Sequence, residues 1–203
     1  MERIEQCDLM QKNSADVSAI CGKSKILFFN AQKRGRIGKR FSIGKTERAT
    51  MKILVSACLL GESCKYSGGN NYNQAVCDFA RGHQVVPVCP EVLGGLPTPR
   101  CPAEIVQGVV TNKEGINVDR EFRAGAAKAL AIAKENGVEL AILQSRSPSC
   151  GVKEIYDGTF SGTKIPGQGV FAKMLMDEGV RVLDAGELPK IILKNEDGKC
   201  QSD

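Results

Sequence analysis

The chain has 203 residues, of which 42% are hydrophobic and 25% charged, values typical of a soluble globular domain. Its sequence has no apolar run near the roughly 18 residues that a membrane span needs. Its formal net charge of +5 is uneven, because residues 1–50 hold 11 Lys and Arg against 5 Asp and Glu, whereas residues 51–203 hold 17 against 18. The part after residue 50 therefore gives no support for a nucleic-acid-binding surface, and we expect neither a nucleic-acid nor a membrane partner.

Residues 1–50 show no sustained helical or alternating period, and residues 32–40 carry five basic side chains in nine. One interpretation is a basic tail for a nucleic acid or a membrane surface. We favour the other, an N-terminal extension that is disordered or not native, with Met51 as the natural start. The N-terminus lacks the apolar core of a signal peptide, and the nine cysteines are an odd number, so we expect reduced thiols in the cytoplasm.

From Met51 onward, apolar runs alternate with helical patterns. Residues 52–57 (KILVSA) predict a strand buried on both faces, and residues 71–81 predict a helix that Gly82 ends. Residues 84–88 (QVVPV) predict a second strand, in which Pro87 favours a position near the end.

The second half continues the alternation. Residues 105–110 and 116–118 bracket the turn-like string TNKEG and predict a hairpin. Residues 119–136 form the strongest helical pattern, with Asp119 as its expected cap and Gly137 as its stop. The remaining expected elements are a third strand, a further helix and a last strand, at 138–143, 168–178 and 180–183.

Alternating strands and helices indicate an α/β fold. We predict three layers: a mainly parallel sheet of four to five strands, helices on both faces, and a small β-hairpin insertion. This domain should span residues 51–188, followed by a polar C-terminal tail over residues 189–203.

Three cysteines follow the three predicted inner strands: Cys58, Cys89 and Cys150. Ligands of parallel sheets bind outside the carboxyl ends of the strands, so we expect these thiols to converge. Three thiolates without an obvious fourth ligand indicate a zinc or iron–sulfur site with one open position. The alternative is that they are buried core residues, as free cysteines often are.

The only histidine, His83, falls in the turn before the second strand, and no Cys-x-x-Cys pair occurs. Both facts count against a zinc site and favour iron–sulfur without fixing it. Cys64 lies six residues beyond Cys58 and is a candidate fourth ligand or resolving thiol. We expect Cys77 to be a core residue and Cys101 to be incidental, and the flanking cysteines carry no signal: Cys7, Cys21 and Cys200.

Polar residues accompany the predicted thiol site. Glu91 follows Cys89 by two positions and is a candidate general acid or base, with a solvated loop glutamate as the alternative. The loop 145–151 (SRSPSCG) offers hydroxyls to a substrate or a cluster. The glycine-rich segment 162–169 leads into a helix and is a weak candidate for a phosphate cradle.

Four strings carry a resemblance in the same order: ILVSACLLGESCKYSGGNN, VPVCPEVLGGLPTPRCPAEI, FRAGA and LQSRSPSCG. They resemble the YbbK-like domain family, formerly a domain of unknown function, whose members include thiouracil desulfidases. The resemblance covers about residues 51–188 and leaves residues 1–50 outside.

The resemblance implies a [4Fe-4S] cluster bound by only three cysteines, which match Cys58, Cys89 and Cys150. The fourth iron would take the thiocarbonyl sulfur of a thiolated uracil, as a Lewis acid and without net electron transfer. A glutamate and a serine that assist in the family map to Glu91, as proton shuttle, and Ser145, which would bind or protonate the base.

The expected reaction is therefore desulfuration of 2-thiouracil, 4-thiouracil or 4-thiouridine monophosphate, with sulfide release. Lys164 or residues 167–169 are candidates for holding a substrate phosphate, and iron–sulfur assembly proteins are expected partners. Two rival hypotheses are a non-catalytic iron–sulfur or metal carrier and a nucleotide-binding regulatory domain with core cysteines.

Overall fold

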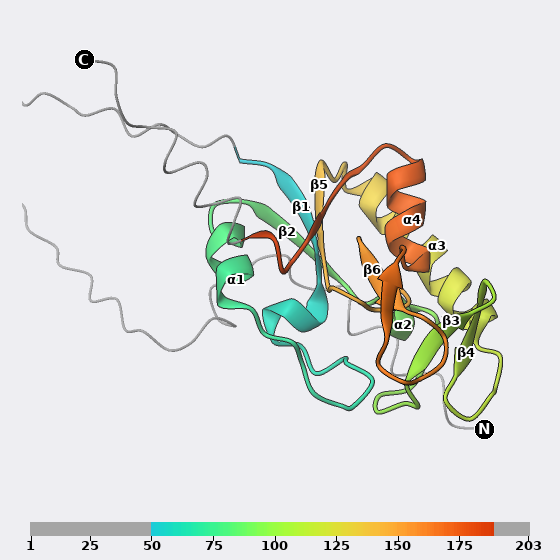
Figure 1. Ribbon diagram of the computed structural model, residues 1–203. Helices are drawn as coiled ribbons and strands as arrows, with labels where there is room; N and C mark the ends of the chain where they lie inside the picture. Colours follow the sequence, from blue (N-terminus) through green and yellow to red (C-terminus); the bar gives the residue numbers. More distant parts are fainter. Residues whose placement is uncertain (1–49, 189–203) are drawn as a thin grey trace, which may run out of the picture. The chain divides into compact units, whose positions relative to one another are not determined.

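The computed structural model describes residues 50–188 (Figure 1). The expected N-terminal extension and the C-terminal tail from residue 189 lie outside the described residues, and so do three of the nine cysteines: Cys7, Cys21 and Cys200.

The centre of the fold is a four-stranded parallel sheet with the order β2-β1-β5-β8. β1 (Lys52–Ser56) pairs with β2 (Gln84–Val88) on one side and with β5 (Leu140–Leu143) on the other, and β8 (Arg181–Asp184) pairs with β5. The predicted α/β class and parallel sheet are confirmed. Since all strands run in one direction, their carboxyl ends meet along a single edge of the sheet.

Helices cover the sheet, which explains the continuous apolar runs. α3 (Asp119–Glu135) and α4 (Val170–Asp177) pack on one face, where Leu54 joins the alanines of α3 in the main core cluster. Figure 1 shows α1 (Gln74–Ala80) on the opposite side of the sheet from α3 and α4. Side chains alternate along a strand, so β1 needs apolar residues toward both layers, and Ile53 to Val55 are fully buried.

A short helix, α2 (Pro90–Leu93), follows β2 directly and lies backbone to backbone on α3. A Cβ atom at Gly125 of α3 would lie 1.8 Å from the carbonyl oxygen of Pro90, and one at Gly94 would lie 2.2 Å from that of Glu121. The glycine of the FRAGA string therefore lets α3 approach the helix that carries Glu91.

The predicted turn at residues 111–115 is present, since an antiparallel bridge joins Thr111 to Asn117 across it. The sequence missed a second turn within residues 105–110: β3 (Ala103–Val106) pairs with β4 (Val109–Asn112) through Gln107–Gly108. Both turn residues have positive φ, 50° and 84°, which suits the right-handed twist of a two-residue hairpin. A second hairpin that the sequence did not predict joins β6 (Glu154–Tyr156) to β7 (Lys164–Pro166).

Two predicted helix boundaries need correction. Val118, not Asp119, is the N-cap of α3, and the Asp119 carboxylate accepts the backbone N–H of Val110 and pairs with Arg123. α1 starts later than predicted, because Asn73 caps it by accepting the N–H of Val76. A 3₁₀ turn over Ala57–Leu60 follows β1 and holds the first of the three candidate thiols.

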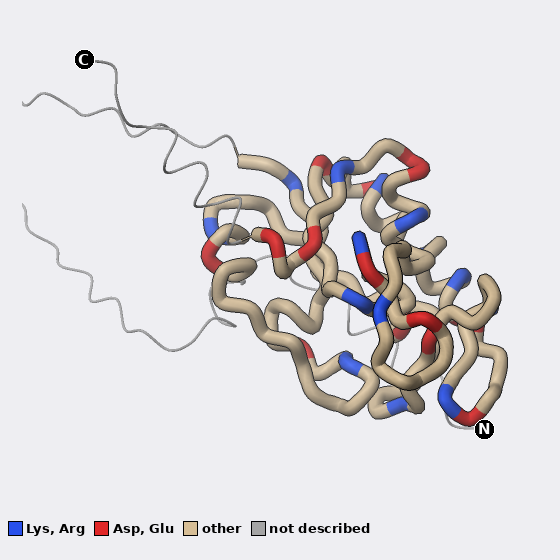
Figure 2. The backbone as a smooth tube through the Cα atoms, viewed as in Figure 1, with Lys and Arg blue, Asp and Glu red and all other residues tan. Residues whose placement is uncertain are grey.

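Acidic and basic residues are interspersed over residues 50–188 in the view of Figure 2. This pattern agrees with the near-zero charge of the chain after residue 50. No helix within the same residues is long and apolar enough to cross a membrane.

Replacement of Gly125 by alanine tests the close approach of α2 and α3. Alanine raises helix propensity by about 1 kcal/mol, yet its methyl group would force the two backbones apart, so we expect a net loss of about 1–3 kcal/mol in the free energy of unfolding. Urea denaturation measures it. Ala124→Ser on the exposed face of α3 should cost less than about 0.5 kcal/mol, and an unfolding curve of Gly125→Ala as stable as the wild type would contradict the packing.

Candidate functional site

The three cysteines that the sequence singled out line one cavity of about 420 Å³ at the carboxyl edge of the sheet. Cys58 lies in the turn after β1, Cys89 directly follows β2, and Cys150 lies in the loop after β5. Parallel register aligns these strand ends, since Ser56 pairs with Val88 and Val55 with Ile142. Residues that are 31 and 61 positions apart in the chain thereby reach the same space.

Cys64 lies between two of these thiols. Side-chain hydrogen bonding with Cys64 lowers the pKa of Cys58 and lowers that of Cys89 to about 7, against the opposing effect of burial. The same interactions raise the pKa of Cys64 itself, because its single S–H hydrogen is shared between the two neighbouring sulfurs. The pair Cys58 and Cys89 is therefore prepared for deprotonation, whereas Cys64 keeps its hydrogen.

Two further groups stabilise the thiolate forms. The side-chain amide of Asn71 donates to the Cys58 sulfur over 3.7 Å. The backbone N–H of Val92, in the first turn of α2, lowers the pKa of Cys89. Amide donors of this kind commonly accompany thiolates at metal and cluster sites.

Cys150 has a different environment, because its side chain is buried. Burial raises the pKa of this thiol, and a hydrogen bond from Ser56 only partly offsets the effect. The loop around it is closely packed: a Cβ atom at Gly151 would lie 2.8 Å from the carbonyl oxygens of Ser147 and Glu154. A buried thiol becomes a thiolate most readily when a cation accepts it.

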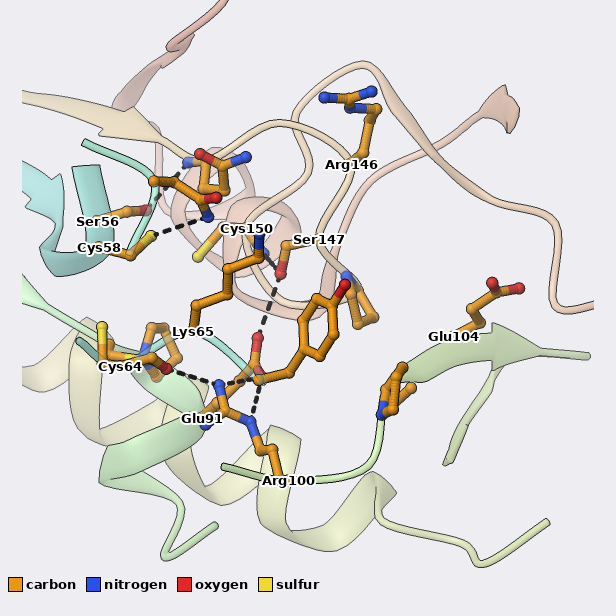
Figure 3. A pocket seen from close by; sticks show the side chains of 18 of the residues that line it. Ser56, Cys58, Cys64, Lys65, Glu91, Arg100, Glu104, Arg146, Ser147 and Cys150 are labelled. Carbon is orange, nitrogen blue, oxygen red and sulfur yellow. Dashed lines mark hydrogen bonds and ion pairs between the residues drawn. The ribbon is translucent and has the colours of Figure 1, made fainter. Parts of the chain in front are cut away.

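Glu91 enters the cavity from the first turn of α2 and lies between Arg100 and Ser147 (Figure 3). Its Oε2 accepts from Arg100 Nε over 2.8 Å and forms an ion pair of 2.6 Å with Nη2. Its Oε1 accepts the Ser147 hydroxyl over 3.3 Å. The side chains of Glu91 and Arg100 are only 15% and 7% exposed, so this is not a solvated loop glutamate.

Two of the three serines in the loop after β5, Ser145 and Ser147, line the cavity, and they have different partners. The Ser145 hydroxyl donates to Asp184 at the end of β8, and Asp184 also accepts the N–H of Gly186 over 2.8 Å. Ser147 is the serine that contacts Glu91. It also accepts the N–H groups of Ser149 and Cys150, over 3.0 and 3.2 Å.

Several residues of the cavity had no role in the sequence prediction. Cys101, expected to be incidental, also lines it, as do Arg100 and Asn71. Arg100 stands in the string PRCP, and an arginine between two prolines, close to two cysteines of the cavity, was the signal that could have marked it. Cys77 is buried in α1, in line with the expectation of a core residue.

The glycine-rich segment before α4 does not form a phosphate cradle. The N–H groups of the first turn of α4 donate to the loop that carries Cys150: Val170 to Pro148 O over 2.9 Å and Phe171 to Ser149 O over 2.9 Å. A Cβ atom at Gly169 would lie 2.5 Å from the carbonyl oxygen of Ser149. These glycines allow close packing of α4 on the Cys150 loop, and the N–H groups of the first turn of α4 are already hydrogen-bonded within the protein.

The side chains of the cavity include the donor type of an iron–sulfur cluster. Within residues 50–188, no three Cys, His, Asp or Glu side chains are arranged to hold one metal ion. Thiols are the donors that iron–sulfur clusters use, and three of them from three strand ends line one cavity with Cys64 beside them.

Comparison with known proteins gives three findings. The family described as 2-thiouracil desulfurase matches residues 53–187. An uncharacterized protein named YbbK from Bacillus subtilis (strain 168) is 42% identical over 150 residues, which are 69% of this chain and 99% of that protein. A solved structure, the [4Fe-4S]-dependent thiouracil desulfidase TudS, is similar with a TM-score of 0.64 and 39% identity, over 72% of this chain and 99% of that one.

Replacement of Cys64 by alanine tests whether its hydrogen bonding lowers the pKa of Cys89. Loss of the donated hydrogen bond should raise the pKa of Cys89 from about 7 toward the ordinary thiol value of about 8.5, so alkylation of Cys89 should need a higher pH. The measurement is iodoacetamide labelling of cluster-free protein between pH 6 and 10, read peptide by peptide. Cys101→Ala is the matched control, and an unchanged pH profile in Cys64→Ala would contradict the hydrogen bond.

Proposed function

This chain belongs to the 2-thiouracil desulfurase family, and from that premise we propose that it removes sulfur from thiolated uracil compounds with the help of a [4Fe-4S] cluster. The proposed reaction exchanges the thiocarbonyl sulfur for the oxygen of water and releases hydrogen sulfide. Atoms and charges balance without an oxidant or a reductant. The observation that carries the proposal is a cavity that holds both a set of thiols and a buried carboxylate.

Cys58, Cys89 and Cys150 are the proposed cluster ligands. When bound, the cluster would supply an iron without a protein ligand, which acts as a Lewis acid toward the thiocarbonyl sulfur. Cys64 is not needed as a fourth ligand in this proposal. Its hydrogen-bonded thiol stabilises two of the three ligands in their thiolate form.

Glu91 is the proposed general base. Its carboxylate lies in the same cavity as the thiols, and it can accept a proton from the water that attacks the thiocarbonyl carbon. Arg100 occupies its Oε2, which leaves Oε1 as the oxygen that faces Ser147. A proton taken up by Glu91 can then pass through the Ser147 hydroxyl toward the departing sulfur.

The choice of the serine follows from these contacts. The motif suggests Ser145, whose role stays a prediction, and its hydroxyl is hydrogen-bonded to Asp184. Ser147 contacts Glu91 directly, so we propose Ser147 for the proton relay. We propose that Ser145 contacts the thiolated uracil.

The proposed substrates are 2-thiouracil, 4-thiouracil and 4-thiouridine monophosphate. The cavity has the size of ordinary small-molecule sites and is lined by aromatic side chains at Tyr66, Tyr156 and Phe160, which suit a planar pyrimidine. Lys65 and Arg146 also line it and are better candidates for a substrate phosphate than Lys164, which does not.

A carrier that stores and delivers a cluster is the rival function. It would need the thiols but not a buried carboxylate with an arginine and a serine on its two oxygens. Glu91 therefore separates the two hypotheses.

An anaerobic assay of the reconstituted protein with the three substrates, read as sulfide release, tests the desulfidase proposal. We expect sulfide from at least one substrate. Glu91→Gln should keep its iron but lower turnover by about 10²–10⁴-fold, because the general base is lost. Replacement of all three ligand cysteines by serine should abolish iron binding and the brown colour.

Cys64→Ser is the control for the ligand set and should stay brown with its iron content unchanged. Ser145→Ala should affect turnover less than Ser147→Ala if the relay runs through Ser147. Full turnover of Glu91→Gln would rule out Glu91 as the general base. No sulfide from any substrate would overturn the desulfidase proposal and leave the carrier.

A further inference from the structure

Arg100 takes no part in the proposed proton transfers, yet all three of its guanidinium nitrogens form hydrogen bonds. Nε and Nη2 hold Oε2 of Glu91, at 2.8 and 2.6 Å, and Nη2 also donates to the carbonyl oxygen of Cys64 over 3.0 Å. Nη1 donates to Pro97 O over 3.2 Å and to Thr98 Oγ1 over 3.1 Å. A side chain that is 7% exposed and bound on every nitrogen has little freedom to move.

The backbone of Arg100 fastens the same neighbours. Its N–H donates to the carbonyl oxygen of Tyr66 over 2.7 Å. Arg100 is thus hydrogen-bonded to the segment 64–66 twice, once through its backbone N–H and once through its side chain. This segment carries the Cys64 thiol, which lines the cavity with Cys58 and Cys89.

On the other side of Glu91, a chain of hydrogen bonds leads to the third thiol. Ser147 donates to Oε1 of Glu91 and accepts the N–H groups of Ser149 and Cys150. Arg100, Glu91 and Ser147 therefore join α2 and the loop before β3 to the loop after β5 (Figure 3).

The weak member of this chain is the bond between Ser147 and Glu91, at 3.3 Å. Without Arg100, a largely buried carboxylate would keep this single long hydrogen bond, which does not compensate for its desolvation. The carboxylate would then rotate toward solvent. The two-nitrogen grip of the guanidinium is what keeps Oε1 toward Ser147.

We propose that Arg100 is the positioning residue of the site: its guanidinium fixes the orientation of the Glu91 carboxylate and ties it to the Cys64 segment. This inference rests on the proposed function in that Glu91 acts on the substrate. Arginine is required, because a lysine ammonium lacks the planar fork that reaches Glu91, the Cys64 carbonyl oxygen and the two acceptors at residues 97 and 98 together.

The test compares Arg100→Ala, Glu91→Gln and the double variant in the cluster-loaded protein. Arg100→Ala should lower kcat by about a hundredfold, because the Glu91 carboxylate is displaced. KM and the iron content should change little, because the three cluster cysteines remain. In the Glu91→Gln background the same change should have almost no further effect, since Arg100 acts through Glu91. Guanidinium ion added at low, non-denaturing concentration should restore part of the activity of Arg100→Ala but none of that of Glu91→Gln.

Arg123→Ala is the matched control, because it removes an arginine that pairs with a carboxylate on the exposed side of α3. It should leave kcat unchanged. Arg100→Lys keeps the charge and much of the side-chain volume and should still lower kcat, so it serves if Arg100→Ala does not fold. Unchanged kcat in either Arg100 variant, or losses that multiply in the double variant, would overturn the inference.

Crystal structures of the wild-type protein and of Arg100→Lys give a readout that does not depend on turnover. We expect Oε1 of Glu91 to leave Ser147 in the variant. If the wild type releases no sulfide, the proposed function fails, and these structures still decide the inference: a displaced Glu91 supports it and an unmoved Glu91 refutes it.

Discussion

The parallel pairing of β1 with β2 and β5 is the constraint on which the site depends. It sets Ser56 beside Val88 and Val55 beside Ile142, so the residues after each strand emerge at one edge. A register slip of one residue would turn the buried side chains of β1 to the opposite face, at the expense of both helical layers. The apolar packing that stabilises the domain therefore also aligns the strand ends that carry Cys58, Cys89 and Cys150.

Around this edge of the sheet, backbones of neighbouring elements pack directly on each other at glycines. Gly125 lets α3 touch the short helix of Glu91, and Gly169 lets α4 touch the loop of Cys150. The result is a rigid wall with two kinds of thiol: a pair whose pKa values are lowered by Cys64, and a buried one whose pKa is raised. Binding of a cationic cluster would remove the desolvation penalty of the buried thiolate, which links cofactor binding to the stability of this wall.

The sheet, the long helices and the convergence of strand ends were within reach of the sequence, because buried parallel strands are continuously apolar and α3 is rich in alanine. The turn at Gln107–Gly108 was missed because Val109 and Val110 extend the apolar run on its far side. Arg100 and Ser147 were missed for another reason. Their contacts with Glu91 span 9 and 56 residues through irregular loops, and no periodicity records such distances.

The most direct test of the account is a crystal structure of the full chain after anaerobic reconstitution, with anomalous data at the iron edge. The account predicts iron in the cavity, ligated by Cys58, Cys89 and Cys150, with Cys64 and Cys101 unligated and Glu91 still held by Arg100. Iron bound to Cys64, or iron located outside this cavity, would contradict it.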